Sequence, residues 1–542
     1  MNSKIKHLLC ANVIAFISIL ITLLGNPYRQ IDNMINSIFL NNMYDNDYYC
    51  AFVHPLCGEI VKIIDSIFTN ADGYVLGIRL VSFLCYWWIA YLILKMKPKC
   101  ICYWLMYIVM TIGFNIPNQN FTVRAAMFAS VGFFTILLTF YRFRNKKYYM
   151  IGLFFIFIAL LGRKEASLLM LPYIILCIFL FVLENKGELN RSVIRVLSYF
   201  VPIALVMITM IGTKGIISTS PKHIEDTEFN NYRSSVVDYS IKSYVELKKN
   251  MPDLTENDYE LLVNRFVGDT DKIDSDYLKK IANVANIPNY NTNIYGVIRA
   301  SVDSIRLCLK GEMLTKLLFI LCGLIGIYIL IFISDIYDKI EVILSGLGTW
   351  IIFIYFEYKG RLLDRVAQPV LLAILVIFLI SLFKQKENIV KFKKNKIIIC
   401  MIILCTIYPS ISFVRFMSSN QVTFAVNCRA NEDEYSYGDD IYIWSTGDFC
   451  GTALWQFVEK KELPSASFIK HNYPWGASFC SKNFYYKHLG GNPIKKLLEK
   501  NYYFVSNNPN SLITYYNEHY NIDVKATRNG NELGFKIWEL DY

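Results

Sequence analysis

The chain has 542 residues, of which 54% are hydrophobic and only 18% are charged. Soluble globular proteins carry about 25% charged residues, so this composition excludes a disordered or fibrous chain and argues against a wholly soluble enzyme. The apolar excess lies in long blocks, and several runs of about 18 or more residues are each long enough to cross a bilayer. The composition therefore predicts a polytopic α-helical membrane protein.

The net charge of +11 does not indicate a nucleic-acid partner. Basic residues gather in short links between the apolar runs, notably at Lys95–Lys99, Arg142–Lys147 and Lys384–Lys396. Lys and Arg concentrated beside membrane spans set the orientation of those spans. We therefore interpret the charge as a topology signal and expect no nucleic acid among the partners.

The apolar runs predict about eleven membrane spans. They lie near Ile5–Leu24, Tyr74–Leu94, Ile101–Gly113, Ala125–Tyr141, Tyr148–Leu161, Ser167–Leu183, Val196–Gly212, Met313–Ile333, Val342–Tyr355, Val366–Phe383 and Ile397–Phe413. The first run lacks a small-residue cleavage site before Asn26, which favours a retained span over a cleaved signal peptide.

Alternation of about eleven spans puts the basic N-terminus and the basic links on the same side of the membrane. The positive-inside rule makes that side the cytoplasm. The opposite side then receives three long polar segments, residues 25–73, 213–312 and 414–542. We therefore expect a plasma-membrane protein with a cytoplasmic N-terminus and an extracytoplasmic C-terminal part.

The first outer segment contains two stretches with apolar residues at helical spacing, from Ile31 to Phe39 and from Cys57 to Phe68. Each stretch has one apolar and one polar face. Such helices either lie along the membrane surface or pack on a protein core.

The segment 213–312 is predicted to be mostly helical, over Asn231–Lys249, Thr255–Phe266 and Asp274–Ala285. The acidic stretch Asp269–Asp276 faintly resembles a calcium loop. It lacks the glycine and the bidentate glutamate of such a loop, so we interpret it as a solvated helix start.

Short strand and helix patterns alternate after about Val422, which predicts a small α/β domain. The domain division is therefore 1–413 for the membrane module and 414–542 for the extracytoplasmic domain. Strands are expected at Ile441–Trp444, Tyr502–Val505, Asp523–Thr527 and Phe535–Leu540, and helical segments at Thr452–Lys461, Lys496–Lys500 and Ser511–Tyr520.

Asp45 and Asp47 are the candidate catalytic residues. They lie in the first outer segment, followed by Tyr48, Tyr49 and His54. In an extended segment, residues two apart project to the same side. One carboxylate of such a pair can accept a proton while the other orients the acceptor or holds a cation. The alternative is an Asp-rich turn at the tip of a polar loop.

Several cations stand at the outer ends of spans, where Lys and Arg should be rare. They are Arg124, Arg163, Lys164, Lys359, Arg361 and Arg365. Arginine pairs bidentately with phosphate, so these residues are candidate phosphate ligands. Otherwise they anchor the helices at lipid headgroups or pair with acidic residues inside the bundle.

These features together resemble the GT-C superfamily of polytopic glycosyltransferases, which includes the protein O-mannosyltransferases. The resemblance covers nearly the whole chain. It rests on the acidic motif Asp45–Tyr49 with His54-Pro55 downstream, two surface helices around it, and a soluble domain after the last span. It also rests on Gly162–Ala166 before a span with Pro172, and on Lys359–Arg361 before Pro369. Many members have adjacent acidic residues where this chain has Asp-Asn-Asp, and the segment 213–312 is an added insertion suited to acceptor recognition.

The resemblance implies a polyprenyl-phosphate sugar as donor and a hydroxyl of a glycan, lipid or protein as acceptor. Asp45 or Asp47 would remove the acceptor proton, with Tyr48, Tyr49 and His54 nearby. Arg361, Arg365 and Arg163 would hold the phosphate, and a single displacement would invert the anomeric carbon. A divalent cation, Mg²⁺ or Mn²⁺, is compatible with the Asp pair but is not required. The alternatives are a polysaccharide repeat-unit polymerase, a transporter or flippase of lipid-linked glycans, and a structural scaffold.

Overall fold

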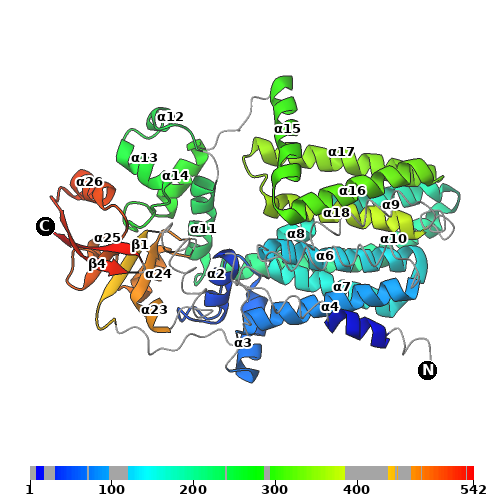
Figure 1. The fold of residues 1–542 in the computed structure, drawn as a ribbon, viewed down its shortest axis with the longest axis horizontal. Helices are drawn as coiled ribbons and strands as arrows, with labels where there is room; N and C mark the ends of the chain where they lie inside the picture. The colour runs from blue at the N-terminus through cyan, green and yellow to red at the C-terminus, as the bar shows by residue number, and fades with distance from the viewer. Residues whose placement is uncertain are drawn as a thin grey trace.

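The computed structural model of the chain contains a bundle of long helices and an extramembrane body that packs on one end of it (Figure 1). The structure describes residues 8–16, 31–69, 72–96, 120–238, 241–285, 293–384, 437–445, 449, 466–477, 479–532 and 534–542. Within these ranges the chain is mostly helical, with one small sheet near the C-terminus.

Seven helical segments in the described residues are long and apolar enough to cross a membrane. They are built from α4 (Gly73–Met96), α6 (Phe121–Leu138) with η1 (Thr139–Phe143), α8 (Lys164–Leu168) with α9 (Leu171–Glu184), α10 (Leu189–Ser218), α16 (Met313–Phe332), α17 (Ile336–Tyr358) and α18 (Asp364–Lys384). The shorter α7 (Lys146–Gly162) packs among them. The predicted class of helical membrane protein is thus confirmed. The predicted spans at 101–113 and 397–413, and part of that at 5–24, lie outside the described residues.

Small residues bring α6 and α7 close together at the centre of the bundle. A Cβ added at Gly132 would lie 2.8 Å from the carbonyl oxygen of Gly152 and 2.7 Å from Ile156. Glycine at such crossings lets two backbones approach, which favours helix association in a membrane. α6 is almost wholly enclosed by its neighbours, and so is α18, which packs on it.

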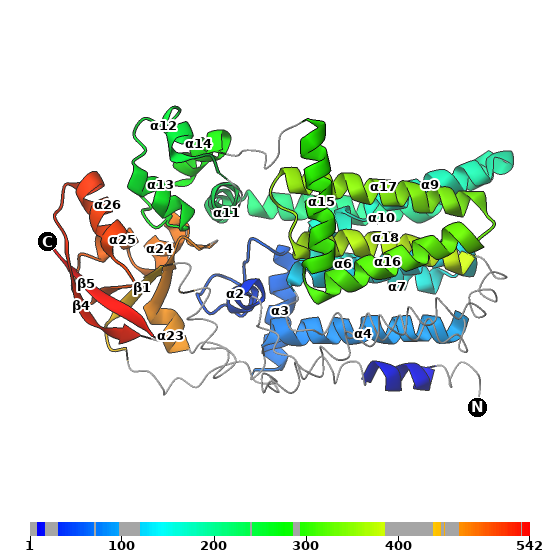
Figure 2. The same ribbon diagram turned by 45° about the horizontal axis from the view of Figure 1, so that its top comes forward.

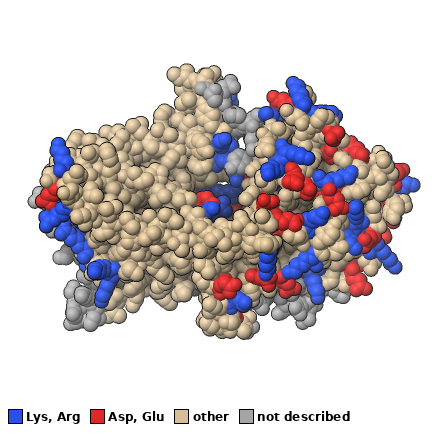
Figure 3. Space-filling view, turned by 180° about the vertical axis from the view of Figure 1, so that it is seen from behind, with Lys and Arg blue, Asp and Glu red and all other residues tan. Residues whose placement is uncertain are grey.

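Contacts at the two ends of the bundle show that its helices run in alternate directions. At the end near the extramembrane body, the amide of His54 donates to the carbonyl of Leu161 at 2.8 Å. At the far end, Arg142 donates to the carbonyl of Phe383 at 3.3 Å. The basic links 142–147 and 184–195 consequently lie at the far end of the bundle. Figure 3 shows basic side chains there, separated from the extramembrane half by a largely uncharged belt.

α17 is longer than the predicted span at 342–355. It begins at Ile336, after the N-cap Asp335, and so carries Asp338 and Glu341 into the bundle. Both side chains are buried, and Glu341 accepts hydrogen bonds from Ser381 and Cys177, each at 2.7 Å. These partners explain how a carboxyl group is accommodated among apolar helices.

The extramembrane body combines helices from the first and second outer segments with the C-terminal sheet (Figure 2). Its helices are α2 (Ile31–Leu40), α11 (Ile224–Val237), α12 (Tyr244–Lys248), α13 (Glu256–Val263), α14 (Ser275–Ala285), α23 (Ala466–His471), α24 (Lys482–His488), α25 (Pro493–Lys496) and α26 (Asn510–Tyr520). The strands β1 (Ile441–Ser445), β2 (Asn472–Trp475), β3 (Tyr502–Val505), β4 (Lys525–Glu532) and β5 (Phe535–Asp541) form one sheet in the order β2-β1-β3-β5-β4. β1 pairs in parallel with β2 and β3, and the other pairs are antiparallel.

One hydrophobic core joins the first outer segment, the second outer segment and the tail. Asp269 is a polar centre of this junction. Its buried carboxylate accepts hydrogen bonds from Asn492 at 2.8 Å, Tyr515 at 2.9 Å and Tyr520 at 2.6 Å. The interpretation of Asp269–Asp276 as a solvated helix start is therefore wrong for Asp269, although Asp274 does bond the first turn of α14.

Most predicted elements of the body are present, with some differences. The expected helix over 231–249 is divided into α11 and α12, because the chain leaves the helix after Val237. The expected helix end at 496–500 is wrong, since α25 stops at Lys496. The helix expected at 452–461 lies outside the described residues. β2, α24 and the helix α15 (Ile294–Lys310) were not predicted.

The two amphipathic stretches of the first outer segment have different surroundings. The apolar face of α2 is buried in the body, with Met34 and Ile38 almost fully enclosed. By contrast, α3 (Pro55–Ile67) leaves Ile60, Ile63 and Ile67 exposed. A protein core thus covers α2, whereas α3 has the exposed apolar face expected of a surface helix.

Candidate functional site

A cavity of about 1520 Å³ opens where the bundle meets the extramembrane body. In Figure 3 basic side chains line a hollow between the two halves. One wall is apolar and comes from the membrane helices α8, α9 and α17, through Leu168, Pro172, Ile351, Ile352, Tyr355 and Phe356. The cavity therefore joins a membrane-facing apolar surface to a polar chamber.

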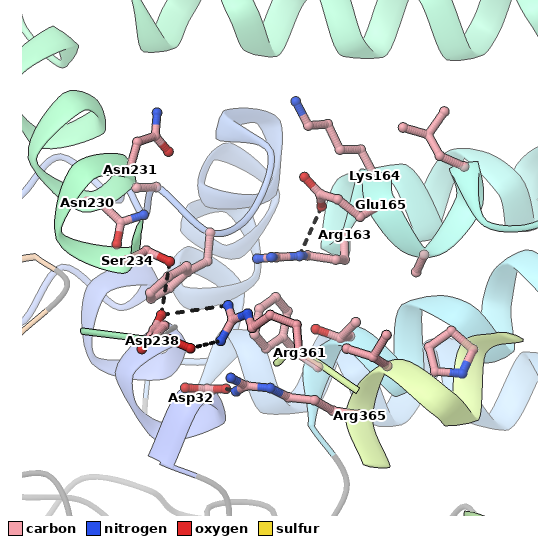
Figure 4. A pocket seen from close by; sticks show the side chains of 18 of the residues that line it. Asp32, Arg163, Lys164, Glu165, Asn230, Asn231, Ser234, Asp238, Arg361 and Arg365 are labelled. Carbon is pink, nitrogen blue, oxygen red and sulfur yellow. Dashed lines mark hydrogen bonds and ion pairs between the residues drawn. The ribbon is translucent and has the colours of Figure 1, made fainter. Parts of the chain in front are cut away.

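The polar walls contain more cations than carboxylates. The cations are Arg163, Lys164, Lys214, Arg233, Arg265, Arg361 and Arg365, and the carboxylates are Asp32, Glu165 and Asp238. Figure 4 shows the guanidinium groups of Arg163, Arg361 and Arg365 pointing the same way, toward α2 and α11. This surplus of positive charge suits a ligand that carries a phosphate.

Asp32 is the carboxylate that the first outer segment contributes to the cavity. It lies in the first turn of α2, where the helix dipole stabilises a negative charge. Arg365, at the start of α18, donates to its Oδ2 at 2.9 Å, and Asn120 donates to the same atom at 2.6 Å. Two elements of the bundle thus fix the orientation of one carboxylate oxygen.

Asp238 pairs with Arg361 next to the Asp32–Arg365 pair (Figure 4). The guanidinium Nη2 of Arg361 lies 3.8 Å from Oδ2 of Asp238, and its Nη1 donates to the backbone carbonyl of the same residue at 3.0 Å. Ser234 also donates to Oδ2, at 3.0 Å. Arg361 and Arg365 therefore face carboxylates from two outer segments that lie far apart in the sequence.

The other predicted cations divide into two groups. Arg163 lines the cavity, 2.9 Å from Glu165 and above the ring of Phe121, and Lys164 lines it as well. Arg124 is not among the lining residues; its electrostatic neighbours Tyr74, Tyr86 and Arg79 lie on α4. Lys359 is exposed at the end of α17 and is also absent from the lining.

Asp45 and Asp47 do not line the large cavity. Both are exposed, in a loop where Asp45, Asp47 and Tyr48 adopt positive φ angles of 47°, 53° and 60°. Lys222 pairs with the carboxylate of Asp47 and holds its pKa below the ordinary value, while Lys487 donates to the backbone carbonyl of Asp45. The left-handed turns explain why two residues predicted to project together from an extended segment have separate partners.

The predicted neighbours of this pair have structural contacts. His54 caps α3 by accepting from the amide of Leu56 at 3.1 Å, and its other ring nitrogen lies 3.0 Å from the carbonyl of Met210. Burial lowers the pKa of His54. Tyr48 packs over α3, where Lys62 lies 5.6 Å from its ring. His54 thereby connects the first outer segment to α10.

A smaller pocket of about 310 Å³ lies beside the large cavity and contains Asp47 and Tyr49. Its aromatic residues include Phe39, Phe479 and Phe484, and Tyr49 stacks on His223 with ring centroids 3.8 Å apart. Both hollows share Ile35, Ala51 and Phe52 as lining residues. The two pockets are therefore adjacent.

The surroundings of the acidic loop do not suit a divalent cation. Asp45 and Asp47 have Lys222 and Lys487 as their partners, and these ammonium groups oppose the binding of a second positive charge. Mg²⁺ and Mn²⁺ prefer several converging oxygen ligands. We accordingly derive no reaction step through a metal.

Sequence reasoning missed Asp32, Asp238, Lys214, Arg233 and Arg265. Asp32 stands at the polar start of an amphipathic helix close to the membrane, which was a usable signal. Asp238 and Arg233 lie in the predicted helix 231–249; Arg233 is inside α11, and Asp238 follows Val237, where the helix breaks. That break has no clear mark in the sequence.

No family model, curated protein or solved structure matches the chain. The geometry of the cavity is accordingly the basis for assigning a function.

Proposed function

We propose that the protein is a membrane glycosyltransferase that moves a sugar from a polyprenyl-phosphate donor to an acceptor hydroxyl at the outer face of the membrane. One observation carries this proposal: the large cavity combines an apolar wall from membrane helices with a surplus of cations. A lipid phosphate has the same two parts, an apolar chain and an anionic head. Pockets that bind amphiphiles offer matching apolar and charged walls.

In the proposed reaction Arg361 and Arg365 hold the donor phosphate, with Arg163 beside them. A phosphate bound there would compete with Asp238 and Asp32 for the two guanidinium groups. The carboxylate of Asp32 would then be available to accept the acceptor proton, and Asn120 would continue to orient it. We therefore favour Asp32 over Asp45 and Asp47 as the general base.

The proposed reaction is a single displacement at the anomeric carbon of the sugar. The acceptor hydroxyl gives its proton to Asp32, its oxygen bonds to the anomeric carbon, and the bond from that carbon to the phosphate oxygen breaks. The leaving polyprenyl phosphate carries the electron pair as an added negative charge, which the arginines stabilise. One displacement inverts the configuration of the anomeric carbon.

The GT-C architecture and the orientation belong to the same proposal. The GT-C architecture is supported by the long polar segments that follow the first and seventh predicted spans and by the sheet that follows the last span. The orientation is supported by the basic links at the far end of the bundle, which the positive-inside rule assigns to the cytoplasm. The cavity would then open at the outer surface of the plasma membrane.

The test uses the full chain reconstituted in lipid nanodiscs with a panel of polyprenyl-phosphate sugars and candidate acceptors. The proposal predicts release of polyprenyl phosphate together with a glycosylated acceptor, and loss of both products in Asp32→Asn. A flippase would instead move the intact donor across liposome membranes without cleaving it. Transbilayer movement of uncleaved donor, with no transfer from any donor in the panel, would overturn the proposal.

A further inference from the structure

α15 (Ile294–Lys310) carries a stripe of apolar side chains that no described residue covers. Ile294, Ile298, Val302, Ile305 and Leu309 follow one another at helical spacing, and each is between 47% and 81% exposed. Five large apolar residues exposed in one row are unusual on a surface in contact with water.

The remainder of the helix has two further faces. Gly296, Ala300, Ser304 and Cys308 are buried on the side that packs against α16 and α17. Charged residues occupy the third face, where Arg299, Arg306 and Lys310 outnumber Asp303. At 100° per residue, this charged face lies between the exposed stripe and the buried face. An apolar and a charged face side by side characterise a helix that lies in a membrane interface.

The orientation of α15 fits the same location. Figures 1 and 2 both show α15 crossing the bundle at a steep angle, at the end where α17 ends and α18 begins. α3 also stands across the bundle axis at this end, on the other side of the bundle in Figure 1. α3 also exposes apolar side chains, those of Ile60, Ile63 and Ile67. Two helices with exposed apolar faces therefore lie at the same level along the bundle axis.

The lipid-facing surface of the bundle continues to the stripe of α15. Ile343, Leu347, Trp350 and Ile351 are exposed on α17, the helix against which α15 packs. A bilayer that covers these side chains would reach its headgroup region at α15. This continuity favours the bilayer over a partner protein as the occupant of the stripe.

We propose that α15 lies in the outer interfacial layer of the membrane, with its apolar stripe in the acyl boundary and Arg299, Arg306 and Lys310 bound to anionic lipid headgroups. The turn after α15 connects this helix to the start of α18, which contributes Arg365 to the cavity. The Asp364 carboxylate accepts from the amide of Glu312 at 2.8 Å and from Thr315 at 2.5 Å, and the next residue is Arg365. α15 thereby fixes the level of the cavity mouth relative to the membrane.

The experiment measures the depth of nitroxide labels in the full chain reconstituted in liposomes, with the unsubstituted chain labelled identically as background. The labels are placed at Ile298→Cys and Arg299→Cys on α15. The controls are Ile327→Cys on the exposed side of α16 and Val245→Cys on α12 in the extramembrane body. Collisions with oxygen report the acyl region, and collisions with a water-soluble nickel complex report the aqueous phase.

We expect the oxygen-to-nickel ratio at Ile298→Cys to be several-fold higher than at Val245→Cys and to approach that at Ile327→Cys. The ratio at Arg299→Cys should be markedly lower than at Ile298→Cys. Equal ratios at Ile298→Cys and Val245→Cys would place α15 in water and overturn the proposal. Protection of Ile298→Cys from both reagents would also overturn it, because a partner or a second copy would then cover the stripe.

A second arm tests the headgroup contact by comparing phosphatidylcholine liposomes with liposomes that also contain phosphatidylglycerol. Each cation near an anionic surface strengthens lipid binding by about fivefold. Phosphatidylglycerol should therefore raise the ratio at Ile298→Cys, and the triple change Arg299→Gln, Arg306→Gln and Lys310→Gln should abolish the increase. The same response in the triple variant would exclude recognition of anionic headgroups.

Discussion

Asp32 and Asp47 line neighbouring hollows, but different parts of the chain build the walls around them. Helices of the bundle supply the apolar wall beside Asp32, whereas Asp47 faces a pocket between the first outer segment, α11 and α24. The side chain of Asp32 is 29% exposed and that of Asp47 is 64% exposed. Only the first hollow joins a carboxylate to a surface that a lipid tail could follow.

The two carboxylates also differ in the cations that hold them. Arg365 binds Asp32 from the start of a membrane helix, and a phosphate could replace the carboxylate as its partner. Lys222 binds Asp47 at the surface, where an ion pair is screened by water and contributes about 0–1 kcal/mol. Position beside the membrane, and not the acidic motif alone, therefore distinguishes the candidate base.

The largest expected effect comes from exchanging the carboxylates for amides. Asp32→Asn should lower the rate of sugar transfer by about 10²–10⁴, the usual cost of removing a general base. Asp45→Asn and Asp47→Asn should leave it within a few-fold of the unsubstituted rate. The measurement is the initial rate of transfer at matched amounts of folded protein. A large loss in Asp47→Asn with a normal rate in Asp32→Asn would reverse the assignment.

The next largest effect is expected from removing the arginines that line the large cavity. Arg361→Ala and Arg365→Ala should each remove a charge-assisted contact worth about 1.5–3 kcal/mol, which corresponds to roughly a 10- to 150-fold loss in kcat/KM for the donor. Lys359→Ala is the matched control, because this cation lies in the same region but does not line the cavity. Equal losses in all three variants would show that positive charge near the membrane matters, without a specific phosphate site.

A smaller effect is expected on the stability of the extramembrane body, where Asp269 holds the second outer segment against the tail. Asp269→Asn removes the charge that accepts from Tyr515 and Tyr520, and should destabilise the docking of the tail by about 1–3 kcal/mol. Hydrogen exchange in α26 should increase, whereas Asp276→Asn, an exposed change in α14, should not alter it. Unchanged exchange in Asp269→Asn would contradict the role of this buried contact.

The smallest effect is a pH dependence that belongs to the smaller pocket. Burial and the nearby Lys487 lower the pKa of His488 to about 4, while Asp45 opposes the shift. In the unfolded chain His488 binds a proton near pH 6.5, before it does so in the folded protein. The contribution of His488 to stability is therefore constant above that pH and declines as the pH falls toward 4. Thermal unfolding of the extramembrane body, measured from pH 7.5 to 4.5, should show this decline.

His488→Gln keeps a polar side chain but cannot take up the proton. Its unfolding temperature should vary less across the same pH range than that of the unsubstituted chain. The same slope in both proteins would assign the pH dependence to other groups.

The sequence predicts the bundle well because a membrane span is a local property of the chain. Runs of apolar residues mark eight predicted spans that the structure describes as helices, and helical spacing marks α2 and α3. The tail is also largely recovered, because β1, β3 and α26 follow short local patterns.

The site was harder to predict because its contacts join distant parts of the chain. Asp32 and Arg365 are 333 positions apart, and no local pattern relates them. Arg361 and Arg163 could be singled out because they break the charge bias at the ends of spans. Asp238 could not, since its place in the cavity depends on where α11 ends.

The most direct test of the proposed lipid-phosphate site is photo-crosslinking of a reactive polyprenyl phosphate to the reconstituted protein, followed by mass spectrometry. The account predicts crosslinks on α17 near Ile351–Phe356 and on α8 and α9. Unlabelled polyprenyl phosphate should compete for them, and the double variant Arg361→Ala, Arg365→Ala should weaken them. Crosslinks confined to lipid-facing residues such as Ile327 and Ile331 of α16, without competition and with no effect of the double variant, would contradict it.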